Sequence, residues 1–92
     1  MKLTKTITIK NSQGLHLRPA ALIVKILRAC RSRVFFTCQN KTVDARSIMG
    51  LLTLVAQKNQ TITIVVEGED GKQTMEALTG AFKACFGEEA VF

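Results

Sequence analysis

The 92-residue chain contains no tryptophan or tyrosine, and only one proline and one histidine. Its five phenylalanines are not interleaved with basic residues, as a stacking platform for RNA or DNA requires, so the sequence disfavours nucleic acid as a partner. The three cysteines, Cys30, Cys38 and Cys85, include no C-x-x-C pair, which argues against a disulfide framework and against a zinc site. We therefore expect reduced thiols, and neither a metal nor a cofactor.

Long apolar runs are also missing, and their absence argues against insertion into a membrane. The first ten residues alternate in polarity instead of forming the continuous apolar core of a signal peptide, so we expect a cytoplasmic protein. No linker, repeat or low-complexity segment interrupts the sequence. Its length suits one domain over residues 1–92, which we expect to be a monomer.

Acidic side chains are scarce: the chain has 7 aspartates and glutamates against 13 lysines and arginines, which gives a net charge of +6. The basic residues are spread along the chain, which favours a solvated basic surface that steers acidic protein partners. The charge taken alone also fits a basic nucleic-acid-binding module, and that alternative stays open here.

Alternating polarity predicts four strands, and helical spacing of apolar residues predicts three helices. The expected strands cover residues 3–9, 34–38, about 42–43 and 61–67. The expected helices cover about 19–28 or 19–29, then 48–52, then a last segment with the buried face Met75, Leu78, Ala81, Phe82 and Cys85. Ser47 should cap the second helix, and Asp70 with Gln73 should form a capping box on the third. The order β-α-β-β-α-β-α predicts an α+β fold with a four-stranded, mainly antiparallel sheet and all three helices on one face.

The first helix has an inner stripe and an apolar flank. The stripe comprises Ala20, Ile23, Val24 and Leu27, and the flank comprises Leu17, Leu22 and Ile26. The flank is interpreted either as a docking surface or as part of a larger buried face, and the sequence alone does not decide between them.

The single histidine, His16, falls at or just before the N-cap of the first helix. Pro19 fits the first turn because it lacks a backbone N–H and has a preset φ. The unpaired N–H groups of a helix start favour an anion, and the Arg18 guanidinium suits phosphate oxygens. A neutral imidazole is a nucleophile near pH 7, so the arrangement predicts reversible histidine phosphorylation.

Two segments resemble one family. Residues 14–21, Gly-Leu-His-Leu-Arg-Pro-Ala-Ala, closely resemble the active-site signature of the HPr family, the histidine-containing phosphocarriers of the bacterial sugar phosphotransferase system. Residues 41–50, Lys-Thr-Val-Asp-Ala-Arg-Ser-Ile-Met-Gly, resemble the regulatory-serine region of that family at the expected separation. The resemblance covers almost the whole chain and implies an open-faced β-sandwich.

The resemblance also implies a function. His16 would accept a phosphoryl group from enzyme I, which phosphoenolpyruvate charges, and pass it to enzyme IIA components. Arg18 would act with His16, while Leu17, Pro19 and Ala20 would position the phosphoryl group. The protein would then be a covalent intermediate between partner enzymes and not itself an enzyme.

Ser47 matches the serine that HPr kinase/phosphorylase modifies in some members of the family. Its predicted N-cap role is by itself a sufficient structural reason for the hydroxyl, so the sequence is consistent both with a regulatory serine and with a purely structural one. A regulatory HPr paralogue that acts mainly through phospho-Ser47 is the alternative within the family, although the intact His16 counts against a purely regulatory form.

A docking surface for the partner enzymes is predicted around His16. It comprises Leu17, Ile48, Met49 and Leu52, with a basic rim of Arg18, Lys25, Arg28 and Arg46. The chain departs from the usual pattern of the family at Leu17, where a small or polar residue is usual, and at Val55, where glycine is common. These departures and the basic charge bear on partner choice.

Overall fold

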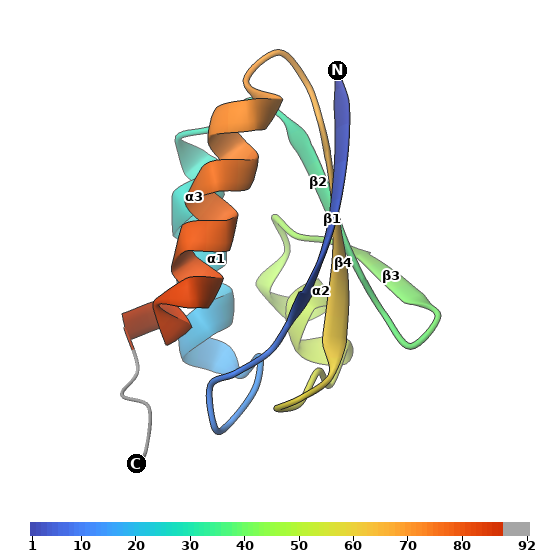
Figure 1. The fold of residues 1–92 in the computed structure, drawn as a ribbon, viewed down its shortest axis with the longest axis vertical. Coiled ribbons are helices and arrows are strands. Elements are labelled where there is room, and N and C mark those ends of the chain that lie inside the picture. Colours follow the sequence, from blue (N-terminus) through green and yellow to red (C-terminus); the bar gives the residue numbers. More distant parts are fainter. Residues whose placement is uncertain (88–92) are drawn as a thin grey trace.

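The computed structural model describes residues 1–87 and confirms the predicted order of elements (Figure 1). The strands are β1 (Lys2–Thr8), β2 (Arg33–Cys38), β3 (Lys41–Asp44) and β4 (Thr61–Glu67). The helices are α1 (Leu17–Arg28), α2 (Ile48–Thr53) and α3 (Gly71–Lys83), and a 3-10 turn, Cys85–Gly87, follows α3.

The sheet has the strand order β1-β4-β2-β3, and each neighbouring pair is antiparallel. The three helices lie on one face of this sheet, as predicted (Figure 1). β4 is hydrogen-bonded on both sides, and its alternate residues Ile62, Ile64 and Val66 are fully buried. The other face of the sheet carries threonines, which explains the period-2 pattern of the sequence.

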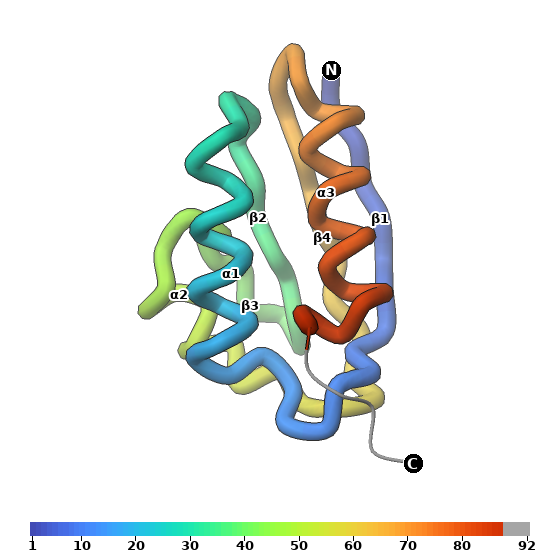
Figure 2. The backbone as a smooth tube through the Cα atoms, turned by 90° about the vertical axis from the view of Figure 1, so that its left-hand side faces the viewer, coloured from blue at the N-terminus to red at the C-terminus, as the bar shows by residue number. Residues whose placement is uncertain are grey.

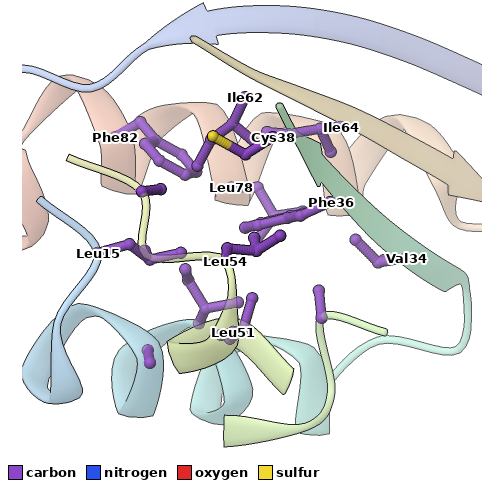
Figure 3. Close-up of a cluster of buried hydrophobic side chains, with 14 of the residues drawn as sticks. Leu15, Val34, Phe36, Cys38, Leu51, Leu54, Ile62, Ile64, Leu78 and Phe82 are labelled. Carbon is purple, nitrogen blue, oxygen red and sulfur yellow. The ribbon is translucent and has the colours of Figure 1, made fainter. Parts of the chain in front are cut away.

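The core lies between the sheet and the helices (Figure 3). Phe36 of β2 packs against Phe82 of α3 with ring centroids 5.9 Å apart, and Phe82 contacts Phe86 edge-on at 4.6 Å. Leu51 of α2 and Leu78 of α3 are also fully buried in this cluster. Burial of one such side chain contributes about 1.5–3 kcal/mol, so these residues fix the helices on the sheet.

Helix α1 shows how the core divides its apolar residues. Ala20, Ile23 and Leu27 of the predicted inner stripe are fully buried, and Val24 is half-buried. Of the flank, Leu22 and Ile26 are half-buried against the core, while Leu17 stays exposed. The core therefore covers more of the flank than a docking surface would leave open, and only Leu17 of the three flank residues is exposed.

The predicted capping box on α3 is wrong. Asp70 is the N-cap residue, but its side chain makes no capping hydrogen bond to the backbone N–H groups at the start of its own helix. Its carboxylate instead accepts hydrogen bonds from the backbone N–H of Arg31 (2.7 Å), from that of Ser32 (2.9 Å) and from the Ser32 hydroxyl. These donors, the Ser32 hydroxyl first, hold the pKa of Asp70 below its usual value. Asp70 therefore ties the start of α3 to the loop between α1 and β2.

The end of α3 also differs from the prediction. The helix stops at Lys83, so Cys85 lies in the 3-10 turn, half-buried, instead of on the helix. Cys30, Cys38 and Cys85 are free thiols, with Cys38 buried in the core. None of the helices in the described part of the chain has the length and apolar character that crossing a bilayer requires.

Candidate functional site

A tight turn between β1 and α1 delivers His16 to the start of the helix. Gly14 has φ +64°, and a side chain at this position would collide with the carbonyl of Ala56. The Leu15 N–H donates to that carbonyl at 2.8 Å. Asn11 is buried, and its side-chain amide donates to the Gly14 carbonyl, while its backbone carbonyl accepts from the Gly14 N–H at 3.1 Å. The turn is thus held by the α2–β4 loop, which lies beside it in both views (Figures 1 and 2).

His16 is the N-cap residue of α1, as the sequence predicts, with extended backbone angles (φ −90°, ψ −168°). Its carbonyl accepts the first helical hydrogen bond, from the Ala20 N–H at 3.1 Å. Pro19 has no N–H, so the helix-start donors without an acceptor inside the helix are those of Leu17 and Arg18. The first turn carries no acidic residue, which leaves the positive end of the helix dipole available to an anion.

The predicted site residues divide into two groups. Leu17 and Arg18 are exposed beside the half-buried His16, where they can contact a phosphoryl group or a partner. Pro19 and Ala20 are buried and point into the fold. Because the Ala20 N–H is already used by His16, Ala20 supports the site by packing and has no amide to offer a phosphoryl oxygen.

Ser47 caps α2, as the sequence predicts. Its Oγ accepts a hydrogen bond from the Gly50 N–H at 2.9 Å, and its carbonyl accepts from the Leu51 N–H at 2.9 Å. The residue is exposed, so its hydroxyl combines a capping role with access from solvent. Helix α2 packs beside α1 (Figure 2), which places Ser47 and His16 on neighbouring helices.

Arg46, which was predicted to belong to the basic rim, is exposed, but its guanidinium is engaged within the fold. Its guanidinium donates hydrogen bonds to three backbone carbonyls: Leu27 at 2.6 Å, Cys30 at 2.8 Å and Ser32 at 2.7 Å. The planar, permanently charged guanidinium thus binds one carbonyl in the last turn of α1, where the helix dipole is negative, and two in the loop that follows. Arg46 is therefore a structural link between α1 and the segment that enters α2.

The predicted docking residues are unequally exposed. Leu17 is 60% exposed and Met49 is 71% exposed, whereas Ile48 and Leu52 are half-buried against the core. Val55, in the loop after α2, is 66% exposed and has φ +51°. We call Leu17, Met49 and Val55 the apolar rim. From the sequence, Val55 was noted only because glycine is common at this position in the family. Its left-handed backbone angle was not predicted, because that angle depends on how the loop contacts the turn before His16.

A hollow of about 340 Å³ lies elsewhere, between β1 and α3. Its lining residues are Lys5, Ile7, Thr8, Lys10, Thr79, Phe82 and Lys83. His16 is not among them. His16 is half-buried, and the exposed Leu17 and Arg18 lie beside it.

Comparison with known proteins identifies the family. The family model described as the PTS HPr component phosphorylation site matches residues 3–84. The phosphocarrier protein HPr of Chlamydia trachomatis is 37% identical over 87 residues, which cover 95% of this chain and 80% of that protein. The HPr-like protein Crh of Halalkalibacterium halodurans is 42% identical over 74 residues, 80% of this chain and 88% of its own length.

A solved structure agrees with this assignment. The crystal structure of HPr-C-His from Thermoanaerobacter tengcongensis superposes with a TM-score of 0.90 at 38% identity, and the match covers 95% of this chain and 98% of that chain. Sequence and fold thus agree, and the chain belongs to the HPr family of phosphocarriers of the phosphotransferase system.

Proposed function

We propose that the chain accepts a phosphoryl group from enzyme I on His16 and passes it to enzyme IIA components. The observation that carries the proposal is the position of His16 at the N-cap of α1, next to the exposed Arg18. An imidazole nitrogen attacks the phosphorus atom with its lone pair, and a P–N bond forms as the bond to the donor breaks. The reverse exchange, with an acceptor on the next protein, releases the phosphoryl group.

The helix start explains why this group is stabilised without being trapped. The N–H groups of Leu17 and Arg18 and the Arg18 guanidinium face the charge of a phosphoryl group on His16. The site is open to solvent, so these interactions are screened by water. A carrier needs this balance, because tight binding of the phosphorylated form would slow transfer to the next protein.

Partners would approach through the apolar rim and the exposed basic residues Arg18, Lys25 and Arg28. The net charge of +6 and the absence of acidic residues in the first turn of α1 favour an acidic partner surface. Ile48 and Leu52, which were predicted to dock, contribute from beneath the rim because they are half-buried.

Phosphorylation of Ser47 by an HPr kinase/phosphorylase would regulate this docking. A phosphate adds a charge of about −1.5 to −2 beside the surface that acidic partners approach. Arg46, the adjacent cation, is engaged with three carbonyls and would not be released to neutralise it without loss of those hydrogen bonds. Repulsion of the partner is therefore the expected effect.

Incubation with phosphoenolpyruvate and a cognate enzyme I tests the main proposal. The expected product carries an acid-labile phosphate that maps to His16, and addition of an enzyme IIA removes it. The variant His16→Ala is the control and should take no label. Absence of label on His16 of the unmodified protein would overturn the proposal.

The similarity to the relative named HPr-like protein Crh supports a second candidate, a regulatory protein that acts through phospho-Ser47. The two functions differ in what enzyme I does. A protein that only regulates takes an acid-stable phosphate on Ser47 from a kinase and ATP, and takes no label from enzyme I.

A further inference from the structure

The backbone of Val55 is in an unusual conformation. Its φ of +51° lies in the left-handed region, which L-residues with a branched Cβ rarely enter. The position is the one after the C-cap residue Leu54 of α2, where helices commonly end on a left-handed glycine. Among residues 1–87 the other non-glycine residues with a positive φ are Gln39, Asn40, Asn59, Cys85 and Phe86, so Val55 is the one β-branched residue in this set.

The surrounding contacts explain why the backbone must turn here. The Val55 N–H donates to the Leu52 carbonyl at 3.3 Å, the last hydrogen bond of the helix end. The next residue, Ala56, is buried and accepts the Leu15 N–H at 2.8 Å. The left-handed turn thus joins the end of α2 to the segment that precedes His16, a geometry that glycine would adopt without strain.

The side chain of Val55 makes little apolar contact within the fold that would compensate for its unfavourable backbone angle. It is 66% exposed, whereas its neighbours Leu54 and Ala56 are 6% and 3% exposed and hold the loop in place. A branched side chain is therefore kept at a position where the backbone disfavours it and the core does not bury it. Backbone strain of this kind is often found at functional sites.

A backbone hydrogen bond links the chain neighbours of Val55 and His16. The Leu15 N–H donates to the Ala56 carbonyl. Val55 directly precedes Ala56, and His16 directly follows Leu15. The other members of the apolar rim, Leu17 and Met49, lie on the helices that flank this bond.

We propose that Val55 is a specificity-determining residue for phosphoryl transfer, whose side chain enters an apolar recess on the acidic partner protein docked over His16. The inference rests on the proposed phosphocarrier function and deepens it. Burial of the valine on docking supplies apolar contact that glycine would not supply, so the chain selects partners that offer the recess. The basic residues around the rim supply the charge complementarity for an acidic partner.

The test compares the unmodified protein with Val55→Gly in the transfer of phosphate from phosphoenolpyruvate through a cognate enzyme I. Loss of a buried valine should raise the KM of the carrier about tenfold, with kcat changed by less than about twofold. The same variant should unfold at a higher urea concentration, because glycine relieves the strain. A KM within about twofold of the unmodified value would overturn the inference.

A matched control separates the side chain from the backbone. Gln39 is also exposed and has φ +48°, but it lies in the β2–β3 turn. Gln39→Gly should relieve strain in the same way and leave the KM unchanged. An equal rise in KM for both variants would assign the effect to the backbone and overturn the role of Val55. If the unmodified protein takes no label on His16, the phosphocarrier proposal itself fails, which is a distinct outcome.

Discussion

Replacement of Arg46 by methionine should destabilise the protein and leave docking intact. The substitution keeps most of the aliphatic stem and removes the guanidinium that donates to the carbonyls of Leu27, Cys30 and Ser32. A hydrogen bond from a charged group contributes about 1.5–3 kcal/mol when it is isolated and well shielded. Here two of the three are partly buried and the third is exposed, and ordering a long side chain costs up to about 2 kcal/mol. We therefore expect the free energy of unfolding to fall by about 2 kcal/mol.

Urea unfolding at constant m-value measures this change, and the melting temperature should fall by roughly 10 °C. Lys25→Met is the matched comparison, since Lys25 is an exposed cation on the last turn of α1. Its loss should change stability by less than about 0.5 kcal/mol and raise the KM for transfer from enzyme I, the opposite pattern to Arg46. A change below about 0.5 kcal/mol for Arg46→Met would refute the structural role derived from its three hydrogen bonds.

Three further predictions test other parts of the fold and site. The lowered pKa of Asp70 means that its contribution to stability is present above the unfolded-state pKa and is lost as pH falls through the folded-state pKa. Urea unfolding from pH 7 to pH 2 should therefore show a smaller loss for Asp70→Asn than for the unmodified protein, and equal losses would contradict this. Gly14→Ala should lower stability by about 2 kcal/mol or more in thermal unfolding, because φ is +64° and the new methyl group meets the Ala56 carbonyl; a near-neutral change would show that the turn can shift. Ser47→Asp and Met49→Ala should each slow phosphoryl transfer from enzyme I, through repulsion and through lost apolar contact respectively. Rates equal to that of the unmodified protein at both low and physiological salt would rule out the docking surface and its coupling to Ser47.

Several features could be predicted from the sequence because they depend on neighbours in the chain. The alternation of residues 61–67 predicted β4 with both of its ends correct, and Ser47 was correctly predicted as an N-cap from its place before an apolar run. His16 was likewise predicted at the start of α1, because Pro19 and the apolar residues after it fix where that helix begins. Local propensity and the preceding turn therefore predicted the element order and the position of His16 at the start of α1.

Other features were decided only by contacts between distant segments. Asp70 had the sequence of a capping box, but the loop that reaches it offers three donors in better positions than its own helix. The sequence alone suggested that Arg46 is a surface cation, whereas the structure shows that its guanidinium donates a hydrogen bond to the carbonyl of Leu27 at the end of α1. The exposure and left-handed backbone of Val55 arise where the end of α2 meets the turn before His16. In each case the sequence supplied the chemical group and the tertiary structure supplied its partner, because hydrogen bonds between segments far apart in the chain leave no periodic pattern in the sequence.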